Sequence, residues 1–266
     1  MEPINCFWIG APLAELELTC LRSWIRFHPV ILYSYQQIEL PADLSGVQLK
    51  DAIEILSQDY FFEYNLRTPA YKYLPFADLF RFTLLHKKGG IWLDLDLTLQ
   101  RPINQSLLEA PYSFSAERTI QKGAYRNREF KEIADIGFLY IKEPNSALTS
   151  YILERIPAKF DSPFKMMLLF RRGLKELGLQ KYVLPAKVFL PLDWFYIKEA
   201  VLTNLEDYPS KYGVAGFERS CLDNPEVIGI HWFRAILRKR NILLENAKPH
   251  SLWTVTKNKM LNHNIS

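Results

Sequence analysis

Two aspartates, Asp94 and Asp96, stand two positions apart in the run IWLDLDLTL at residues 91–99. Every odd position of this run is apolar, which predicts a half-buried strand with both carboxylates on one face, about 6.6 Å apart along the backbone. Carboxylates at that spacing can share one hard divalent cation, directly or through water. Without a positive partner one member would have a raised pKa. The pair therefore favours a cation site over the alternative, a solvated acidic face on an edge strand.

The segment before this strand carries another acid and a guanidinium. Its apolar spacing and closing Gly-Gly pair predict a helix from Pro75 or Phe76 to Lys88. Asp78 and Arg81 are three positions apart and so share one face of that helix. They either bind each other as a surface ion pair or point together at a polar ligand, and both readings stay open.

The start of the chain alternates between strand and helix patterns. NCFWIG reads as a buried strand, residues 13–27 as a helix, and residues 30–33 as the next strand. Strand, helix and strand within about thirty residues indicate a βαβ unit with a right-handed crossover. We therefore expect an α/β fold with a mainly parallel central sheet flanked by helices, and ligands at the carboxyl ends of its strands.

Composition limits the class of protein. With 266 residues, 48% apolar and 23% charged, the chain is too apolar to be disordered, and we expect one domain over residues 1–240. Residues 241–266 read as a basic extension that packs on the domain or trails from it. Between residues 231 and 266 there are seven Lys/Arg and one acid. This suits an anionic membrane surface, a diphosphate or a solvated tail.

Other classes find less support. No nucleic-acid recognition motif accompanies the net charge of +4. No run reaches the ~18 apolar residues of a membrane span, and three distant cysteines indicate a reducing compartment. We therefore expect a cytoplasmic protein, with peripheral contact at the inner membrane surface as an option.

The run PFADLFRFTLLHKKGGIWLDLDLTLQRPI resembles the central signature of the DXD-containing sugar-transfer family. That family includes capsular polysaccharide glycosyltransferases, fungal initiating mannosyltransferases and, more distantly, the large clostridial glucosylating toxins. NCFWIG, ILYSYQQ, LKDAIEIL and VIGIHWFRAIL resemble its other segments. The resemblance implies a single Rossmann-like nucleotide-sugar domain of the GT-A type and transfer from a UDP- or GDP-sugar with retention. It also implies Mn²⁺ or Mg²⁺ as cofactor, a glycan or lipid-linked acceptor, and a role in surface polysaccharide synthesis.

The resemblance also suggests residue roles. Asp96 would ligate the metal, Asp94 would contact the ribose and the metal through water, and His231 would approach the metal or the diphosphate. The imidazole favours manganese modestly. The remaining roles would be donor-sugar binding by Asp78 and Arg81, base stacking by Trp8, and phosphate contacts by Arg234 or Arg238. Asp135 would lie near the anomeric carbon or the acceptor, or would be a loop residue before the strand GFLYI. The basic stretch at residues 117–132 reads as a mobile acceptor loop or as surface.

Two other functions compete. DLDLT also fits the first motif of haloacid-dehalogenase-type phosphatases, with Glu206 and Asp207 as weak candidates for the later acidic pair. A non-catalytic glycan- or membrane-binding module would keep the aromatic content and the basic end. It would not need Asp78, Arg81, Asp94 and Asp96 together.

Overall fold

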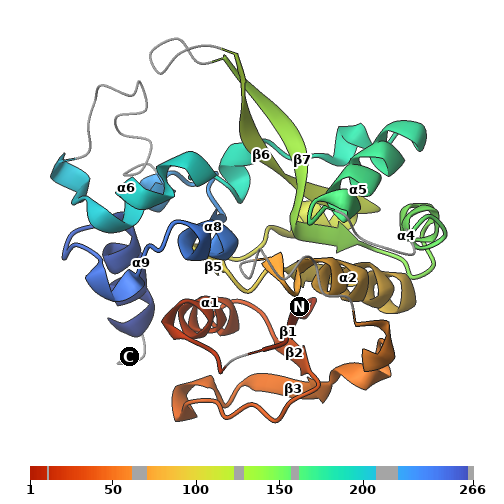
Figure 1. The fold of residues 1–266 in the computed structure, drawn as a ribbon, viewed down its shortest axis with the longest axis horizontal. Coiled ribbons are helices and arrows are strands. Elements are labelled where there is room, and N and C mark those ends of the chain that lie inside the picture. The colour runs from red at the N-terminus through yellow and green to blue at the C-terminus, as the bar shows by residue number, and fades with distance from the viewer. Residues whose placement is uncertain (11, 62–70, 123–128, 157–161, 208–220, 263–266) are drawn as a thin grey trace.

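The structure is a computed structural model that describes the chain except for residues 11, 62–70, 123–128, 157–161, 208–220 and 263–266 (Figure 1). Its strands are β1 (Ile4–Trp8), β2 (Val30–Ser34), β3 (Val47–Asp51), β4 (Gly90–Leu93), β5 (Leu97–Leu99), β6 (Tyr112–Lys122), β7 (Glu129–Ile141) and β8 (Gly229–His231). Its α-helices are α1 (Glu15–Ile25), α2 (Leu74–Lys88), α3 (Gln105–Glu109), α4 (Ala147–Leu153), α5 (Lys165–Glu176), α6 (Ile197–Leu202), α8 (Arg234–Lys239) and α9 (Leu252–Leu261).

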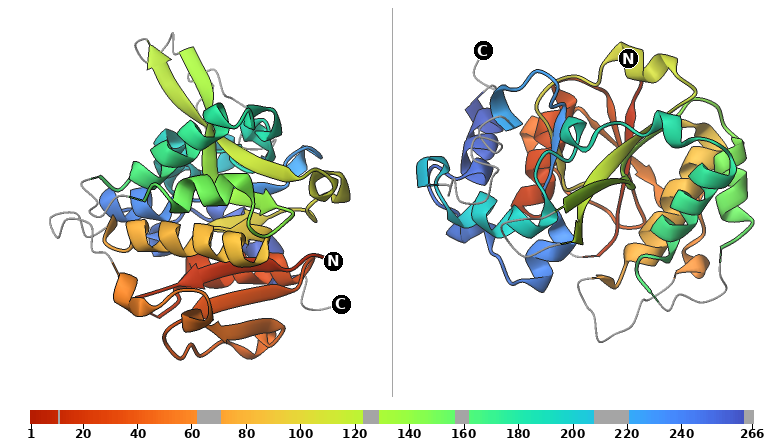
Figure 2. Two further views of the ribbon diagram at one scale, coloured as in Figure 1. Left: turned by 90° about the vertical axis from the view of Figure 1, so that its right-hand side faces the viewer. Right: turned by 90° about the horizontal axis from the view of Figure 1, so that it is seen from above.

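The central sheet has six strands in the order β3-β2-β1-β4-β7-β6. The first four are parallel, whereas β7 and β6 join the sheet antiparallel. Helices cover both faces: α1, α6, α8 and α9 lie on one side, and α2, α4 and α5 lie on the other (Figure 2). The prediction of an α/β fold with a mainly parallel sheet flanked by helices is confirmed.

The predicted βαβ unit is β1-α1-β2. Helix α1 spans Glu15–Ile25, two residues shorter at each end than expected, and buries Leu21 and Trp24 completely. The Glu17 carboxylate accepts a hydrogen bond of 2.9 Å from the Ala14 amide and so caps the first turn. The Trp24 indole donates to the Leu97 carbonyl at 2.7 Å, which ties α1 to β5.

Helix α2 positions one side of the site, and its sequence determines both of its ends. Pro75 stands in the first turn, where its missing N–H costs nothing. The helix ends at Gly89, which has φ +65°, and a Cβ there would lie 2.9 Å from the carbonyl oxygens of Ile141 and Lys142. Glycine is therefore required both by the backbone conformation and by the close approach of the chain after β7.

The expected single strand over residues 91–99 is wrong. Strand β4 ends at Leu93 and β5 begins at Leu97, and the Leu97 amide donates to the Asp94 carbonyl at 3.0 Å to close a turn. The reason is a change of partner. Strand β4 pairs with β7, whereas β5 pairs with β8 in a separate two-stranded sheet. The turn, and not the pleat of one strand, brings Asp94 and Asp96 together.

The end of the described chain packs on the fold. Helix α9 buries Leu252 and Trp253 completely, and the Trp253 ring meets Trp232 edge to face at 5.0 Å. Lys257 pairs with Glu15 of α1 at 3.0 Å. None of the helices in the described ranges has the length and apolar character needed to cross a bilayer.

Candidate active site at the DxD turn

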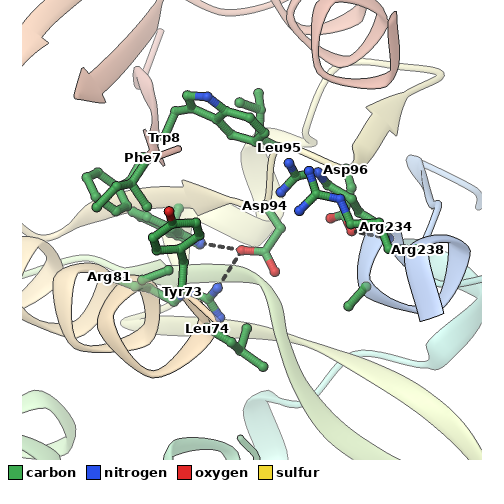
Figure 3. Close-up of a pocket in the computed structure, with 14 residues that line it drawn as sticks. Phe7, Trp8, Tyr73, Leu74, Arg81, Asp94, Leu95, Asp96, Arg234 and Arg238 are labelled. Carbon is green, nitrogen blue, oxygen red and sulfur yellow. Dashed lines mark hydrogen bonds and ion pairs between the residues drawn. The ribbon is translucent and has the colours of Figure 1, made fainter. Parts of the chain in front are cut away.

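Two cavities meet at the turn between β4 and β5. The smaller one, about 160 Å³, extends toward Trp8 at the carboxyl end of β1. The larger one, about 490 Å³, extends toward Asp78 and Asp135. Both are lined by Arg81, Asp94 and Asp96, so the two aspartates lie at the junction. Figure 3 shows the residues that line the smaller cavity.

Asp94 is held from two sides. Arg81 donates to its Oδ1 at 2.6 Å and the Trp92 indole donates to the same oxygen at 2.8 Å (Figure 3). Burial raises the pKa of Asp94 above its ordinary value, and the opposing charge of Arg81 only partly offsets this.

Asp96 is fixed by the closing segment of the fold. Its Oδ1 lies 2.9 Å from His231 Nε2, and its Oδ2 accepts a hydrogen bond of 2.8 Å from the Arg234 amide. Burial acts to raise the pKa of Asp96, but His231 and the Arg234 amide outweigh burial and lower it. As pH rises, Asp96 therefore loses its proton before Asp94 does.

Three predicted metal ligands come together. Asp94, Asp96 and His231 each offer one ligand atom, and these atoms lie within 4.8 Å of one another. His231 Nδ1 is buried and has no hydrogen-bond partner among the described residues. Burial acts to lower the pKa of His231, but Asp96, Asp135 and Asp94 outweigh it and raise it to about 9. Two carboxylates and an imidazole with an unpartnered nitrogen fit a divalent cation such as Mn²⁺.

Asp78 and Arg81 are both buried, so the interpretation as a surface ion pair is wrong. Arg81 is held by the Ile136 carbonyl at 2.9 Å, and its Nη2 lies 3.4 Å from Asp78 Oδ1. That oxygen is buried and has no hydrogen-bond partner within the described part of the chain, and Asp78 lines the larger cavity. Burial raises the pKa of Asp78 to about 7. A polar ligand in the cavity would satisfy the unpartnered oxygen.

Asp135 lies within strand β7, so the interpretation as a loop residue before the strand GFLYI is wrong. The register of β6 against β7 shifts between Phe114 and Ala116, which leaves Ser115 opposite a bulge that contains Asp135. Asp135 Oδ2 accepts from the Gly137 amide at 2.7 Å, and Ser115 Oγ lies 3.3 Å from the Asp135 carbonyl. The bulge places Asp135 in the wall of the larger cavity.

Gly137 keeps the middle of the site open. A Cβ at this position would lie 2.9 Å from Asp135 Oδ2 and 3.8 Å from both Asp94 Oδ2 and the Cε1 of His231. No side chain fits there without moving one of these groups. Three of the predicted site residues, Asp135, Asp94 and His231, therefore lie around Gly137.

Trp8 and Arg234 form the outer wall of the smaller cavity. The Arg234 guanidinium lies 4.2 Å from the centre of the Trp8 ring, and its Nε is 2.6 Å from Glu17 Oε1. Burial lowers the pKa of Arg234 to about 10. Arg238 lines the same cavity. Trp8 is only 5% exposed, so its face toward the cavity is the part a ligand can reach.

A family model described as the glycosyltransferase sugar-binding region containing a DXD motif matches residues 14–113. Residues 14–113 are therefore similar to a glycosyltransferase sugar-binding region. The match contains the DxD turn and also Asp78 and Arg81 of α2, and it confirms the family resemblance and the prediction of a transferase. No curated protein sequence matches the chain. Among solved structures, one described as PaToxG Glycosyltransferase is similar at a TM-score of 0.39 and 13% identity, over 67% of this chain and 70% of that one.

Several cavity residues lie outside the matched sugar-binding region. His231, Arg234 and Asp135 are more than twenty positions beyond residue 113, and the fold returns them to the DxD turn. No sequence motif indicates Glu117 or Arg171, which form an ion pair at 3.0 Å in the wall of the larger cavity. Glu117 belongs to the stretch at 117–132 expected to be a loop or surface. The first residues of this stretch belong to β6, and residues 123–128 lie outside the described ranges.

The acidic pair proposed for a phosphatase does not reach this sugar-binding region. Glu206 and Asp207 lie in a 3₁₀ turn, Leu205–Asp207, whose Leu205 amide bonds to the His250 carbonyl. Neither residue lines the cavities that meet at Asp94 and Asp96.

Proposed function

We propose that the chain transfers a sugar from a nucleoside diphosphate sugar to a saccharide or lipid-linked acceptor, with a divalent metal at Asp94, Asp96 and His231. The observation that supports this most is the meeting of two cavities at the DxD turn. A donor with its diphosphate at the junction would extend its nucleoside into one cavity and its sugar into the other. Mn²⁺ is preferred over Mg²⁺ because an imidazole accompanies the carboxylates.

The smaller cavity suits the nucleoside of a UDP- or GDP-sugar. Trp8, Phe7 and Tyr73 supply aromatic surface for a base, and Arg234 and Arg238 border the junction where the diphosphate would lie (Figure 3). Asp94 would contact the ribose. In the larger cavity, the buried Oδ1 of Asp78, which accepts no hydrogen bond from the residues that the structure describes, would accept one from a hydroxyl of the donor sugar, with Arg81 beside it.

The chemistry requires stabilisation of the departing nucleoside diphosphate. A bound divalent cation supplies a Lewis acid that offsets the developing negative charge, an effect of several kcal/mol. Asp96 and His231, which lie 2.9 Å apart, would hold the cation together with Asp94, whose carboxylate Arg81 holds in place. Asp135 lies on the sugar side of the junction, where its carboxylate would stabilise positive charge at the anomeric carbon.

The first experiment measures turnover of the purified chain with UDP-glucose, UDP-galactose and GDP-mannose, with and without Mn²⁺. We expect nucleoside diphosphate release that EDTA abolishes and Mn²⁺ restores. Undiminished turnover in EDTA would refute the metal assignment. Cleavage of p-nitrophenyl phosphate without any nucleotide-sugar turnover would indicate a phosphatase, and saturable glycan binding without turnover would indicate a binding module.

Retention of configuration at the anomeric carbon and the cellular role are more specific parts of the proposal, and both rest on the family resemblance. Proton NMR of the first product anomer tests retention, because the coupling constant of the anomeric proton distinguishes the two outcomes. A role in surface polysaccharide synthesis would place the protein in the cytoplasm, at the inner face of the membrane.

Membrane contact would use the basic end of the chain. Lys259 lies near Arg26 and Arg101, and these charges, together with burial, lower the pKa of Lys259. Lys257 is already paired with Glu15. We expect Lys259→Glu with Arg101→Glu to reduce retention on phosphatidylglycerol vesicles without changing donor turnover. Equal vesicle retention would remove the membrane contact from the proposal.

A further inference from the structure

The larger cavity continues past Asp135 into a part that the proposed donor does not use. There it is lined by Glu117 and Thr119 of β6 and by Arg171 of α5. Glu117 and Thr119 are two positions apart on one strand, so their side chains project from the same face. An acceptor hydroxyl must reach the anomeric carbon of the donor sugar, which the proposed function places beside Asp135. Glu117 lines the same cavity as Asp135 and is close enough for the two charges to interact.

Glu117 and Arg171 are held together by hydrogen bonds and are not two independent surface charges. The Arg171 Nε donates to the Ala134 carbonyl at 2.7 Å, and its Nη2 donates to Glu117 Oε1 at 3.0 Å. The second carboxylate oxygen of Glu117 has no hydrogen-bond partner among the described residues. Arg171 therefore fixes the carboxylate and leaves one of its oxygens available to a ligand.

Aromatic side chains line the same cavity as this pair, namely Tyr71, Phe164, Trp194 and Phe233. Phe164 is 45% exposed and meets the Tyr71 ring edge to face at 5.8 Å. Apolar walls with a few convergent polar groups are the usual composition of small-molecule sites. A sugar ring presents an apolar C–H face and a rim of hydroxyls, which matches an aromatic wall beside a carboxylate.

The charge state of Glu117 agrees with a role toward hydroxyls. Burial and the Asp135 carboxylate outweigh the opposing charge of Arg171 and raise the pKa of Glu117 to about 7. Near neutral pH this carboxyl group both accepts and donates hydrogen bonds, as a hydroxyl does.

We propose that Glu117 and Arg171 form the acceptor subsite, in which Glu117 accepts a hydrogen bond from a hydroxyl of the acceptor saccharide and Arg171 holds Glu117 in place. This inference rests on the proposed function, because it needs a donor sugar beside Asp135. Glu117 is a binding residue for the acceptor, and Arg171 is a positioning residue that acts through it.

The experiment separates donor hydrolysis from transfer. The full chain with Mn²⁺ receives UDP-glucose, UDP-galactose or GDP-mannose, first with water alone and then with p-nitrophenyl glycosides as acceptors. We expect Glu117→Gln to lower kcat/KM for the glycoside about 10-fold or more, chiefly through KM, while donor hydrolysis stays within about 2-fold of the wild type. The same change at Glu132 on β7, outside the cavity, is the matched control.

Arg171 is tested through its dependence on Glu117. Arg171→Met should raise the acceptor KM, Arg171→Lys should restore part of it, and Glu117→Gln with Arg171→Met should lose little more than Glu117→Gln alone. Equal losses of hydrolysis and transfer in Glu117→Gln, or unchanged transfer, would overturn the subsite. Absence of donor turnover in the wild type would instead contradict the proposed function. Saturation-transfer NMR of the same glycosides with wild type and Glu117→Gln then still decides the subsite, since equal binding would overturn it.

Discussion

Arg81 lies 2.6 Å from Asp94 but 3.4 Å from Asp78, so its closer partner is on the DxD turn and not on its own helix. The guanidinium is also 5.1 Å from the centre of the Trp92 ring and is almost completely buried. One buried positive charge thus serves two carboxylates on different elements. The position of α2 and the position of the DxD turn depend on each other through it.

We expect Arg81→Met to destabilise the fold by about 3–5 kcal/mol, because it leaves buried carboxylates without their counter-charge. Urea unfolding followed by circular dichroism measures the change. Arg101→Met, at a partly buried arginine bound to the Val227 carbonyl, is the control and should cost far less. A change in Arg81→Met no larger than the control would show that Arg81 is not a structural counter-charge.

We expect Asp96→Asn to weaken Mn²⁺ binding at least 10-fold with the fold intact. The asparagine oxygen can still accept the Arg234 amide, so the turn remains capped while one charged ligand is lost. Isothermal titration with Mn²⁺ measures affinity, and thermal unfolding without metal monitors the fold. Asp207→Asn, in the 3₁₀ turn away from both cavities, is the control. Unchanged affinity in Asp96→Asn would place the metal elsewhere.

We expect Gly137→Ala to impair metal binding and donor turnover, because its Cβ would lie 2.9 Å from Asp135 Oδ2. Relief of that contact displaces a side chain of the site, and overpacking of this kind costs about 1–3 kcal/mol. Gly46→Ala is the matched control, because a Cβ there meets nothing within 4 Å. Wild-type turnover in Gly137→Ala would mean that the space around this glycine is not needed.

We expect Asp78→Asn to flatten the pH dependence of stability. Burial raises the pKa of Asp78 to about 7, so between pH 4 and 7 the native state binds a proton that the unfolded state has released. Stability therefore falls as pH rises through this window, by up to about 1.4 kcal/mol per pH unit for one group. Urea unfolding from pH 4.5 to 8 measures the slope, which should be smaller in Asp78→Asn.

Asp43 provides the control for this prediction. Its pKa is lowered by Arg22, so its contribution is present above the unfolded pKa and is lost only as pH falls below that value. Asp43→Asn should leave the slope between pH 5 and 7 unchanged. If Asp78→Asn leaves the slope unchanged as well, Asp78 does not titrate in the native state near pH 7.

Local patterns predicted the elements that local forces determine. The βαβ start and helix α2 follow from apolar spacing and from glycine at φ +65°, and both appear within a few residues of the expected bounds. The break of the DxD strand was not predictable in this way. It depends on β8, whose residue Ile230 pairs with Thr98 from far along the sequence.

The same distinction holds for the site. The aspartates and Arg81 stand in one short motif, whereas Asp135 enters through a bulge that depends on the register of β7 against Ser115. Glu117 shows no motif at all. The alternation of side chains along β6 does not by itself show which of them face a cavity. That becomes clear only when the residues opposite, such as Arg171, are known.

The separation of Asp96 and His231 by 135 positions has a consequence for biosynthesis. At the usual elongation rates of ~5–20 residues per second, a ribosome needs on the order of ten seconds to add the histidine after the aspartate. The proposed ligands Asp94, Asp96 and His231 cannot come together while the chain is still growing through that interval. A cation held by all three would therefore bind only after residue 231 has been added and has folded back onto the DxD turn.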